Sequence, residues 1–66
     1  MTAPTAPPLP LATPAEIANY RRTSTAVLAQ ERYRGEGPPY IRNGRSIRYE
    51  WPAVLEWIEQ HTVRTA

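Results

Sequence analysis

The residues with the most evident chemistry are the arginines at positions 42, 45 and 48, in the stretch YIRNGRSIRY from Tyr40 to Tyr49. A guanidinium is a planar fork of donors that matches the oxygens of a phosphate and the edge of a guanine. All eight basic residues are arginine, although the formal net charge of the 66 residues is only +2. Seven of these arginines lie between positions 21 and 48, so the middle of the chain is electropositive. This distribution favours a polyanionic partner such as nucleic acid.

The same inventory gives catalysis little support. The chain has no aspartate, lysine or cysteine and a single histidine, His61. Its imidazole could form an acid–base pair with Glu56 or Glu59, but a histidine near a helix end is more often a cation beside the last carbonyls. The sequence contains no phosphate-binding loop, zinc-ligand spacing or nucleotide fingerprint. We therefore expect a binding protein rather than an enzyme, with no catalytic residue, metal or cofactor.

The composition also bounds the organisation of the chain. Residues 1–12, MTAPTAPPLPLA, hold four of the eight prolines and no charge, and we expect them to be a disordered leader. This leader is too short and too interrupted by proline to be a signal peptide or a membrane span. The absence of cysteine excludes disulfides and fits a reducing cytoplasm. Residues 13–61 should form the single domain, and residues 62–66 a frayed tail.

A small core must hold that domain together, and its candidates are few. They recur at the spacing of helix and strand faces, and a core of this size is marginal without a partner or a long ligand. The predicted core residues are Ile17, Tyr20, Val27, Leu28, Ile41, Ile47, Tyr49, Val54, Trp57 and Ile58.

Two short helices are predicted first. In TPAEIANY, Thr13 can cap a helix, Pro14 suits the first helical position, and Glu16 completes a capping box. The polar stretch RRTS then interrupts the pattern, and Ser24 is a good cap for a second helix over 25–34, which should end at Gly35. Two helices joined by about four residues form a helix-turn-helix.

The second helix has two different faces. At 100° per residue, Val27, Leu28 and Glu31 fall on one side, which is the only apolar side available to face the core. The opposite side is small and polar at its beginning and becomes hydrogen-bonding and aromatic further along. It carries Thr25, Ala26, Ala29, Gln30 and Tyr33, with Arg32 and Arg34 on its flanks.

A hairpin should follow, with Pro38 and Pro39 before it and Asn43-Gly44 in its turn. A two-residue Asn-Gly loop would pair Arg42 with Arg45 and mix charge into the apolar face. A loop one residue longer would pair Ile41 with Ile47 and gather the aliphatic side chains on one face. Because a slip of one residue exchanges the faces, the hydrophobic pattern favours the longer loop, with Arg45 at the tip.

A third helix is expected after Pro52, reaching about His61. Val54, Trp57 and Ile58 share a face with His61 at the spacing of an amphipathic helix, and this face should close the core. Trp51 precedes the predicted helix and lies off that face, so it is either a lid on the core or an exposed aromatic. The predicted fold class is therefore mainly α with a small β-hairpin, in the order helix, turn, helix, two-stranded wing, helix: a winged helix-turn-helix.

From Leu11 to Gln60 the chain resembles the MerR-like winged-helix domain of small phage excisionases, also called recombination directionality factors, and of the related AlpA-type regulators. The matching segments are TPAEIANY, TSTAVLAQERYRGEGPPYIR, GRSIRY and AVLEWI, and RYRGEGPPYIR with GRSIRY is the most specific part. The chain departs from the family pattern at Arg22, where the turn commonly has glycine, at Glu31, where tryptophan is common, and at Asn43, where an aliphatic residue is common. Glu31 then needs a partner, either Arg34 or an arginine of another element, or a place at the edge of the core.

The resemblance implies an architectural function in site-specific DNA recombination. Such proteins bind double-stranded DNA at repeated sites in an attachment-site arm, associate with each other on the DNA, bend it and direct a phage integrase toward excision. We would expect such a protein in the cytoplasm of the bacterial host, on DNA, and without a membrane partner. The alternatives are a small winged-helix transcriptional regulator of phage genes and, in another class, a protein-interaction module that uses Trp51, Leu55 and the proline-rich leader.

The winged-helix plan assigns a role to each candidate residue. In the recognition helix, base edges or the groove wall would be met by Thr25, Gln30 and Tyr33, with Ser24 at the start of the helix and Arg32 and Arg34 on phosphates. Gln30 can pair with adenine through two hydrogen bonds. In the turn, Arg21 or Arg22 would hold a phosphate. The wing set is Arg42, Arg45 and Arg48, of which Arg45 is best placed to enter a narrow minor groove.

Overall fold

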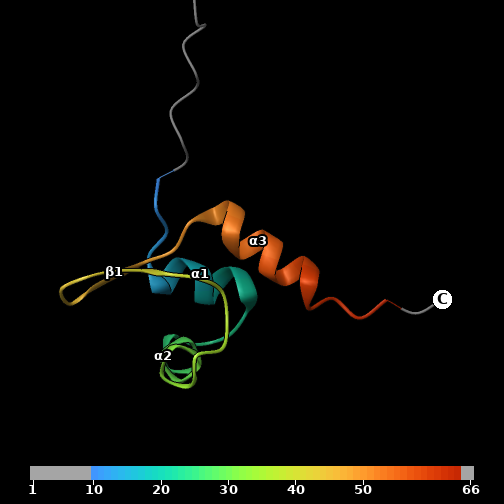
Figure 1. Ribbon diagram of the computed structural model, residues 1–66, viewed down its shortest axis with the longest axis horizontal. Helices are drawn as coiled ribbons and strands as arrows, with labels where there is room; N and C mark the ends of the chain where they lie inside the picture. The colour runs from blue at the N-terminus through green and yellow to red at the C-terminus, as the bar shows by residue number, and fades with distance from the viewer. Residues whose placement is uncertain (1–9, 65–66) are drawn as a thin grey trace, which may run out of the picture.

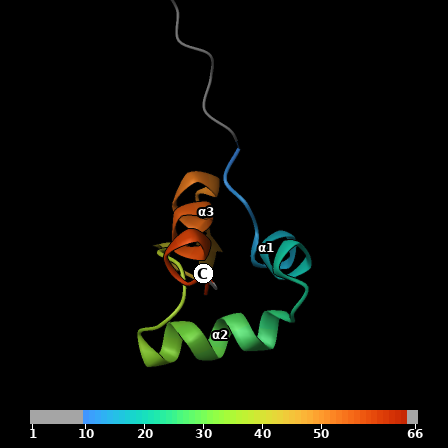
Figure 2. The ribbon, with the colours of Figure 1, turned by 90° about the vertical axis from the view of Figure 1, so that its right-hand side faces the viewer.

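The computed structural model describes residues 10–64, which form three helices and one two-stranded antiparallel hairpin. The elements follow one another as α1 (Pro14–Arg21), α2 (Thr25–Arg34), β1 (Ile41–Asn43), β2 (Ser46–Arg48) and α3 (Trp51–Gln60). The hairpin projects to one side, away from the helices (Figure 1). In the second view α2 runs beneath both α1 and α3 (Figure 2). The predicted fold class, mainly helical with helix-turn-helix and wing in that order, is confirmed.

The starts of the first two helices are as the sequence predicts. Thr13 accepts a hydrogen bond from the backbone N–H of Glu16 at 3.1 Å, and the Glu16 carboxylate accepts one from the backbone N–H of Thr13 at 2.8 Å. This reciprocal capping box satisfies two amides that a helix start otherwise leaves unpaired. Ser24 caps α2 through Val27, and Gly35 ends it in the left-handed conformation with φ 71°. Local capping chemistry therefore sets the bounds of both helices.

The turn between α1 and α2 contains a residue under backbone strain. Arg22 has φ 58° and ψ 47°, the left-handed conformation that glycine adopts readily and that crowds the Cβ atom of other residues. The backbone N–H of Thr23 donates to the carbonyl of Ala18 at 2.8 Å, which closes the end of α1. The turn thus keeps the geometry that a glycine would give it, with arginine in the strained position.

The core forms where α1, α2, α3 and the residue after the hairpin meet. Its buried side chains are Ala12, Ile17, Ala18, Leu28, Tyr49 and Val54. Ile47, Trp51 and Ile58 pack against them and are partly buried. Trp51 therefore covers part of the core, as the lid alternative predicted.

Several predicted core residues prove to be exposed. Tyr20 is 54% exposed, Ile41 39% and Val27 38%, so these three predictions are wrong. The side of α1 that faces the core carries Ile17 and Ala18, and Tyr20 lies outside the core with its ring against Trp51. The start of the fold also differs, since Ala12 is buried and its backbone exchanges hydrogen bonds of 2.7 and 2.8 Å with Tyr49. The expected boundary after residue 12 is therefore too late, and residues 1–9 of the expected leader lie outside the described residues.

The hairpin register is neither of the two that the sequence suggested. Ile41 pairs with Arg48, Arg42 with Ile47 and Asn43 with Ser46, so the loop is Gly44-Arg45. Gly44 has φ 63°, as glycine has at the first loop position of a type II′ turn. Directly opposed residues share a face, and Arg42 consequently lies on the side of Ile47. The preference for pairing Ile41 with Ile47 is wrong because three-residue strands that extend beyond the core give the hydrophobic pattern little weight. Arg45 does lie at the tip.

The third helix begins earlier than expected, at Trp51 rather than after Pro52. Proline is accommodated in its first turn because the amide that proline lacks would have no helical partner there. Val54 is buried, whereas Trp57 and Ile58 are half-buried. His61 ends the helix, and its Nδ1 lies 2.8 Å from the Trp57 carbonyl, so the imidazole is placed beside the last carbonyls of the helix.

Replacing Arg22 by glycine should stabilise the protein. The left-handed conformation costs a residue with a Cβ atom about 1–2 kcal/mol, and glycine relieves this cost in the folded state. Glycine also makes the unfolded chain more flexible, which offsets roughly 0.4–1 kcal/mol of that stabilisation. We expect Arg22→Gly to raise the free energy of unfolding by about 0.5–1 kcal/mol and the melting temperature by roughly 2–8 °C. Arg22→Ala is the control, because alanine removes the guanidinium and keeps the strain. Thermal unfolding followed by circular dichroism measures both, and equal effects of the two variants would contradict strain at this position.

Candidate nucleic-acid interface

The hairpin and α2 border a shallow, open groove of about 590 Å³ on one side of the molecule. From α2 it receives small side chains, Ala26 and Ala29, so the helix backbone is accessible to a partner along this side. From the hairpin it receives two of the wing arginines. The groove is lined by Pro14, Thr25, Ala26, Ala29, Arg32, Arg45, Ser46, Ile47 and Arg48. The groove therefore joins α2 and the hairpin, which follow one another in the chain, in one surface.

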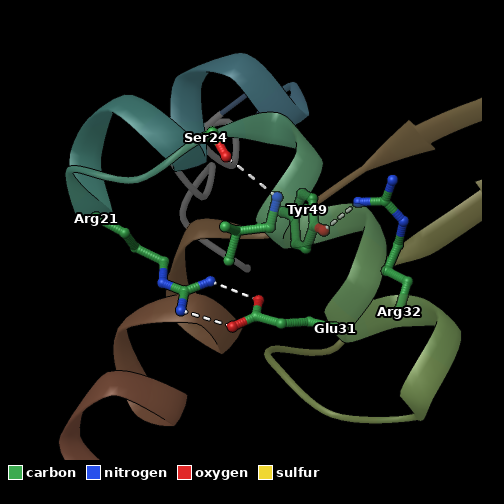
Figure 3. Close-up of polar contacts among 6 residues, drawn as sticks. Arg21, Ser24, Glu31, Arg32 and Tyr49 are labelled. Carbon is green, nitrogen blue, oxygen red and sulfur yellow. Dashed lines mark hydrogen bonds and ion pairs between the residues drawn. The ribbon is translucent and has the colours of Figure 1, made fainter.

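The outward face of α2 continues this surface. Thr25 lies in the groove, and Gln30 and Arg34 are exposed. Tyr33 is 93% exposed, an unusual degree for an aromatic side chain in a small domain. Ser24 is also exposed, but its hydroxyl accepts the backbone N–H of Val27 and so has a structural function as a cap (Figure 3). The exposed face of α2 carries hydrogen-bonding and aromatic side chains and no acidic one.

Arg32 connects α2 to the segment after the wing. Its guanidinium donates a hydrogen bond of 2.7 Å to the hydroxyl of Tyr49 (Figure 3). It also lies 5.7 Å from the centroid of the Tyr40 ring. A hydrogen bond to a charged donor and a cation–π contact both restrict the side chain. Arg32, which lines the groove, is thus held in place by Tyr49 and Tyr40.

Arg21 is committed inside the protein. Its two terminal nitrogens donate to the two carboxylate oxygens of Glu31 at 2.7 and 2.9 Å, and only 15% of the Arg21 side chain is exposed (Figure 3). Its guanidinium also lies 4.7 Å from the ring centroid of Trp57. The partner of Glu31 is therefore an arginine of another helix. The sequence had left the choice between such an arginine and Arg34 open. Arg21 is consequently not free to hold a phosphate, and Arg22, which is exposed, remains for that role.

The Arg21–Glu31 ion pair shifts the pKa of both side chains. The hydrogen bonds from Arg21 lower the pKa of Glu31, partial burial opposes that effect, and the charges of Arg21 and Arg32 add to the lowering. The hydrogen bond to Glu31 likewise raises the pKa of Arg21. The pair is therefore fully ionised near neutral pH, and it cancels one positive and one negative charge between α1 and α2.

The wing arginines are exposed, unlike Arg21. Arg45 occupies the loop, Arg48 donates to the backbone carbonyl of Ile47 at 2.7 Å, and Arg42 lies on the Ile47 side of the hairpin. Arg45 and Arg48 line the groove beside α2, whereas Arg42 does not. Two of the three hairpin arginines thus line the groove that the hairpin shares with α2.

Sequence reasoning missed the residues that hold this surface in place. The phenol of Tyr49 receives Arg32, and the backbone at Gly37 passes so close to Glu31 that an added Cβ would stand 2.8 Å from its Oε1 and 2.9 Å from its Cβ. The signal for Tyr49 was its predicted burial, because a buried phenol needs a hydrogen-bond partner. Gly37 directly precedes two prolines, a pattern that predicts only the end of a helix. The sequence therefore gave no indication that Gly37 packs against the Glu31 side chain.

Comparisons with known proteins do not extend these observations. No protein-family model matches the chain, and searches of curated proteins and of solved structures found no match. Among residues 10–64 no helix is long and apolar enough to cross a membrane. In the same range no three histidine, cysteine, aspartate or glutamate side chains gather where they could hold a metal ion.

The Arg21–Glu31 pair should make stability depend on pH on the acid side. Because the folded-state pKa of Glu31 lies below its unfolded value, its contribution is present above the unfolded pKa, near 4.3, and is lost as the pH falls through the folded pKa. Glu31→Gln should lower the free energy of unfolding at pH 7 by about 1–3 kcal/mol.

Urea unfolding of the wild type and of Glu31→Gln, followed by tryptophan fluorescence between neutral pH and the acid range, measures this contribution. The gap between the two proteins should narrow once Glu31 is protonated. Glu36→Gln makes the same chemical change at an exposed glutamate and should leave stability nearly unchanged. A gap for Glu31→Gln that stays constant across the pH range would contradict the role of its charge.

Proposed function

We propose that the protein binds double-stranded DNA, with α2 in the major groove and the hairpin as a wing on the adjacent backbone or minor groove. The observation that carries this proposal is the groove in which Thr25 and the small side chains of α2 face Arg45 and Arg48 of the hairpin. A helix can enter the major groove only where its outer face is free, and no other element of residues 10–64 covers that face of α2 (Figure 2). Phosphates beside the helix would then meet guanidiniums of the wing.

The roles of the individual residues follow from their placement. Gln30 is exposed on the outer face, where its amide can pair with adenine, and Tyr33 can contact the groove wall. Arg22, in the turn before α2, and Arg34, at the end of α2, are exposed, and they could contact phosphates of a duplex that lies along α2. Arg32 reaches a phosphate only with the donors that Tyr49 does not use.

Within DNA binding, we propose the function of an excisionase, an architectural factor that binds attachment-site DNA cooperatively, bends it and directs a phage integrase toward excision. Support comes from the resemblance of Leu11 to Gln60 to small excisionases, which covers all three helices and the wing. A transcriptional regulator of phage genes would use the same surface, and the two are separated by the DNA that is bound.

Removing Arg45 should weaken DNA binding irrespective of sequence. One phosphate contact fewer should reduce the slope of log affinity against log salt by about 0.9. Fluorescence anisotropy with labelled duplexes at several salt concentrations measures the slope for Arg45→Ala. The matched control is Arg64→Ala, which removes the same charge beyond the far end of α3, where Arg64 pairs with Glu59. An unchanged slope for Arg45→Ala would place Arg45 off the DNA, and equal changes in both variants would reduce the effect to net charge.

The proposed excisionase function is tested by gel shift on three duplexes of equal length: an attachment-site arm, a promoter and a random sequence from the genome that encodes the chain. We expect a ladder of complexes on the arm that fills over a narrow range of protein concentration, because cooperative binding loads neighbouring sites together. A single complex on the promoter with no ladder on the arm would favour the regulator. Failure to bind any of the three would overturn DNA binding itself.

A further inference from the structure

Arg32 of α2 and Arg21 of α1 are both partly buried, but partners of different chemistry hold them. Arg21 donates to both carboxylate oxygens of Glu31 at 2.7 and 2.9 Å, so its positive charge is balanced within the protein. Arg32 donates to the phenol hydroxyl of Tyr49 at 2.7 Å, and no carboxylate of residues 10–64 forms an ion pair with it. Because a phenol hydroxyl is an uncharged acceptor, Tyr49 orders the Arg32 guanidinium without neutralising it.

The acceptor for Arg32 is itself fixed by the core. Only 1% of Tyr49 is exposed, and its backbone exchanges hydrogen bonds of 2.7 and 2.8 Å with that of Ala12. The centroid of the Tyr40 ring lies 6.3 Å from that of the Tyr49 ring and 5.7 Å from the central carbon of the Arg32 guanidinium. A buried hydroxyl and an aromatic ring therefore restrain the same guanidinium.

The restrained guanidinium belongs to the groove of the proposed DNA interface. Arg32 lines this groove together with Arg45 and Arg48 of the hairpin, and none of the lining residues is acidic. A guanidinium has five N–H groups, of which Tyr49 takes one, and the second terminal nitrogen of Arg32 points away from the phenol (Figure 3). Since Arg32 is half-buried rather than enclosed, it offers an anion in the groove a charged donor whose position is already set.

We infer that Tyr49 is a positioning residue for the proposed DNA interface, because its hydroxyl holds Arg32 in the groove in which a DNA phosphate would bind. This inference rests on the proposed function and adds to it a buried residue that does not contact DNA itself. A mobile arginine loses much of its rotamer freedom when it binds a phosphate, and this loss weakens binding. Arg32 loses that freedom during folding, so little of the loss remains for the binding step.

The same hydrogen bond also satisfies the phenol, since a buried tyrosine hydroxyl requires a partner. If that were its only role, removing the hydroxyl would change the stability of the protein and leave its affinity for DNA unchanged. If Tyr49 positions Arg32, removing the hydroxyl weakens DNA binding even where the fold is intact. Affinity and thermal stability measured on the same variant therefore separate the two roles.

Tyr49→Phe removes the hydroxyl and keeps the buried ring. We expect its affinity for a labelled random-sequence duplex, measured by fluorescence anisotropy, to fall about two- to tenfold, because the ordering of one side chain moves from folding to binding. The slope of log affinity against log salt should stay that of the wild type, since no charge is removed. An unchanged affinity would overturn the inference. A loss with a reduced slope would also overturn it, because contacts other than that of Arg32 would then have been displaced.

Arg32→Ala shows whether Tyr49 acts through Arg32. This change removes one phosphate contact and should reduce the salt slope by about 0.9. Adding Tyr49→Phe to Arg32→Ala should weaken binding no further, because the hydroxyl has no guanidinium left to hold. A further loss in the double variant would contradict positioning through Arg32. Tyr20→Phe is the matched control, since it deletes the same hydroxyl from a tyrosine that does not line the groove, and its affinity should equal that of the wild type.

Nuclear magnetic resonance of the ¹⁵N-labelled protein without DNA tests the restraint directly. The Nε–H signal of Arg32 is the arginine signal that Arg32→Ala lacks. In the wild type its heteronuclear NOE should match that of the backbone amides, and in Tyr49→Phe it should fall to the value of the exposed Arg34. An Arg32 side chain as mobile as that of Arg34 in the wild type would overturn the inference whether or not the protein binds DNA.

These measurements separate failure of the inference from failure of the proposed function. If the wild type binds the duplex and Tyr49→Phe binds it equally well, DNA binding stands and positioning by Tyr49 fails. If the wild type binds no duplex, the proposed function fails and the inference fails with it.

Discussion

The burial of Tyr49 is the constraint on which the arrangement of this small fold depends. Tyr49 is the largest of the fully buried side chains, and it lies between the wing and α3. Its backbone pairs with Ala12, its hydroxyl accepts Arg32 of α2, and its ring lies 6.3 Å from that of Tyr40 at the base of the hairpin. One residue therefore fixes the segment before α1, α2 and the hairpin relative to each other. A core this small has few other residues that could do so.

The arginines fall into two groups, those with a partner in the folded protein and those exposed to solvent. The arginines that hold the fold together are partnered, Arg21 by Glu31 and Arg32 by Tyr49, whereas those at the periphery are exposed. A partly buried guanidinium needs a partner to offset its lost hydration, while an exposed one keeps its hydration until a ligand arrives. The excess of arginine in the sequence consequently serves two purposes, and the type of residue alone does not tell which purpose a given arginine serves.

The sequence alone predicts contacts that are local in the chain, but it does not predict contacts between separate elements. Capping residues act within one turn of the chain, so the bounds of α1 and α2 were predictable from Thr13, Ser24 and Gly35. The pairing of Arg21 with Glu31 spans two helices and depends on their packing, which residue spacing does not specify. The hairpin register was mistaken for a related reason, since the φ of Gly44 outweighed a hydrophobic alternation that had only three residues in each strand to act through.

The loop after α2 has a consequence for how the surface works. The backbone N–H of Glu36 donates to the Glu31 carbonyl at 2.7 Å, Gly37 lies against the Glu31 side chain, and Pro38 is buried. The segment that joins helix and wing is thus a fixed spacer, whose length and direction are built into the folded state. A ligand that spans both elements would find their separation already set, and little conformational entropy would be lost when it binds. A ligand whose contact points are spaced differently from α2 and the hairpin could not bind both elements, whatever its contacts with individual side chains.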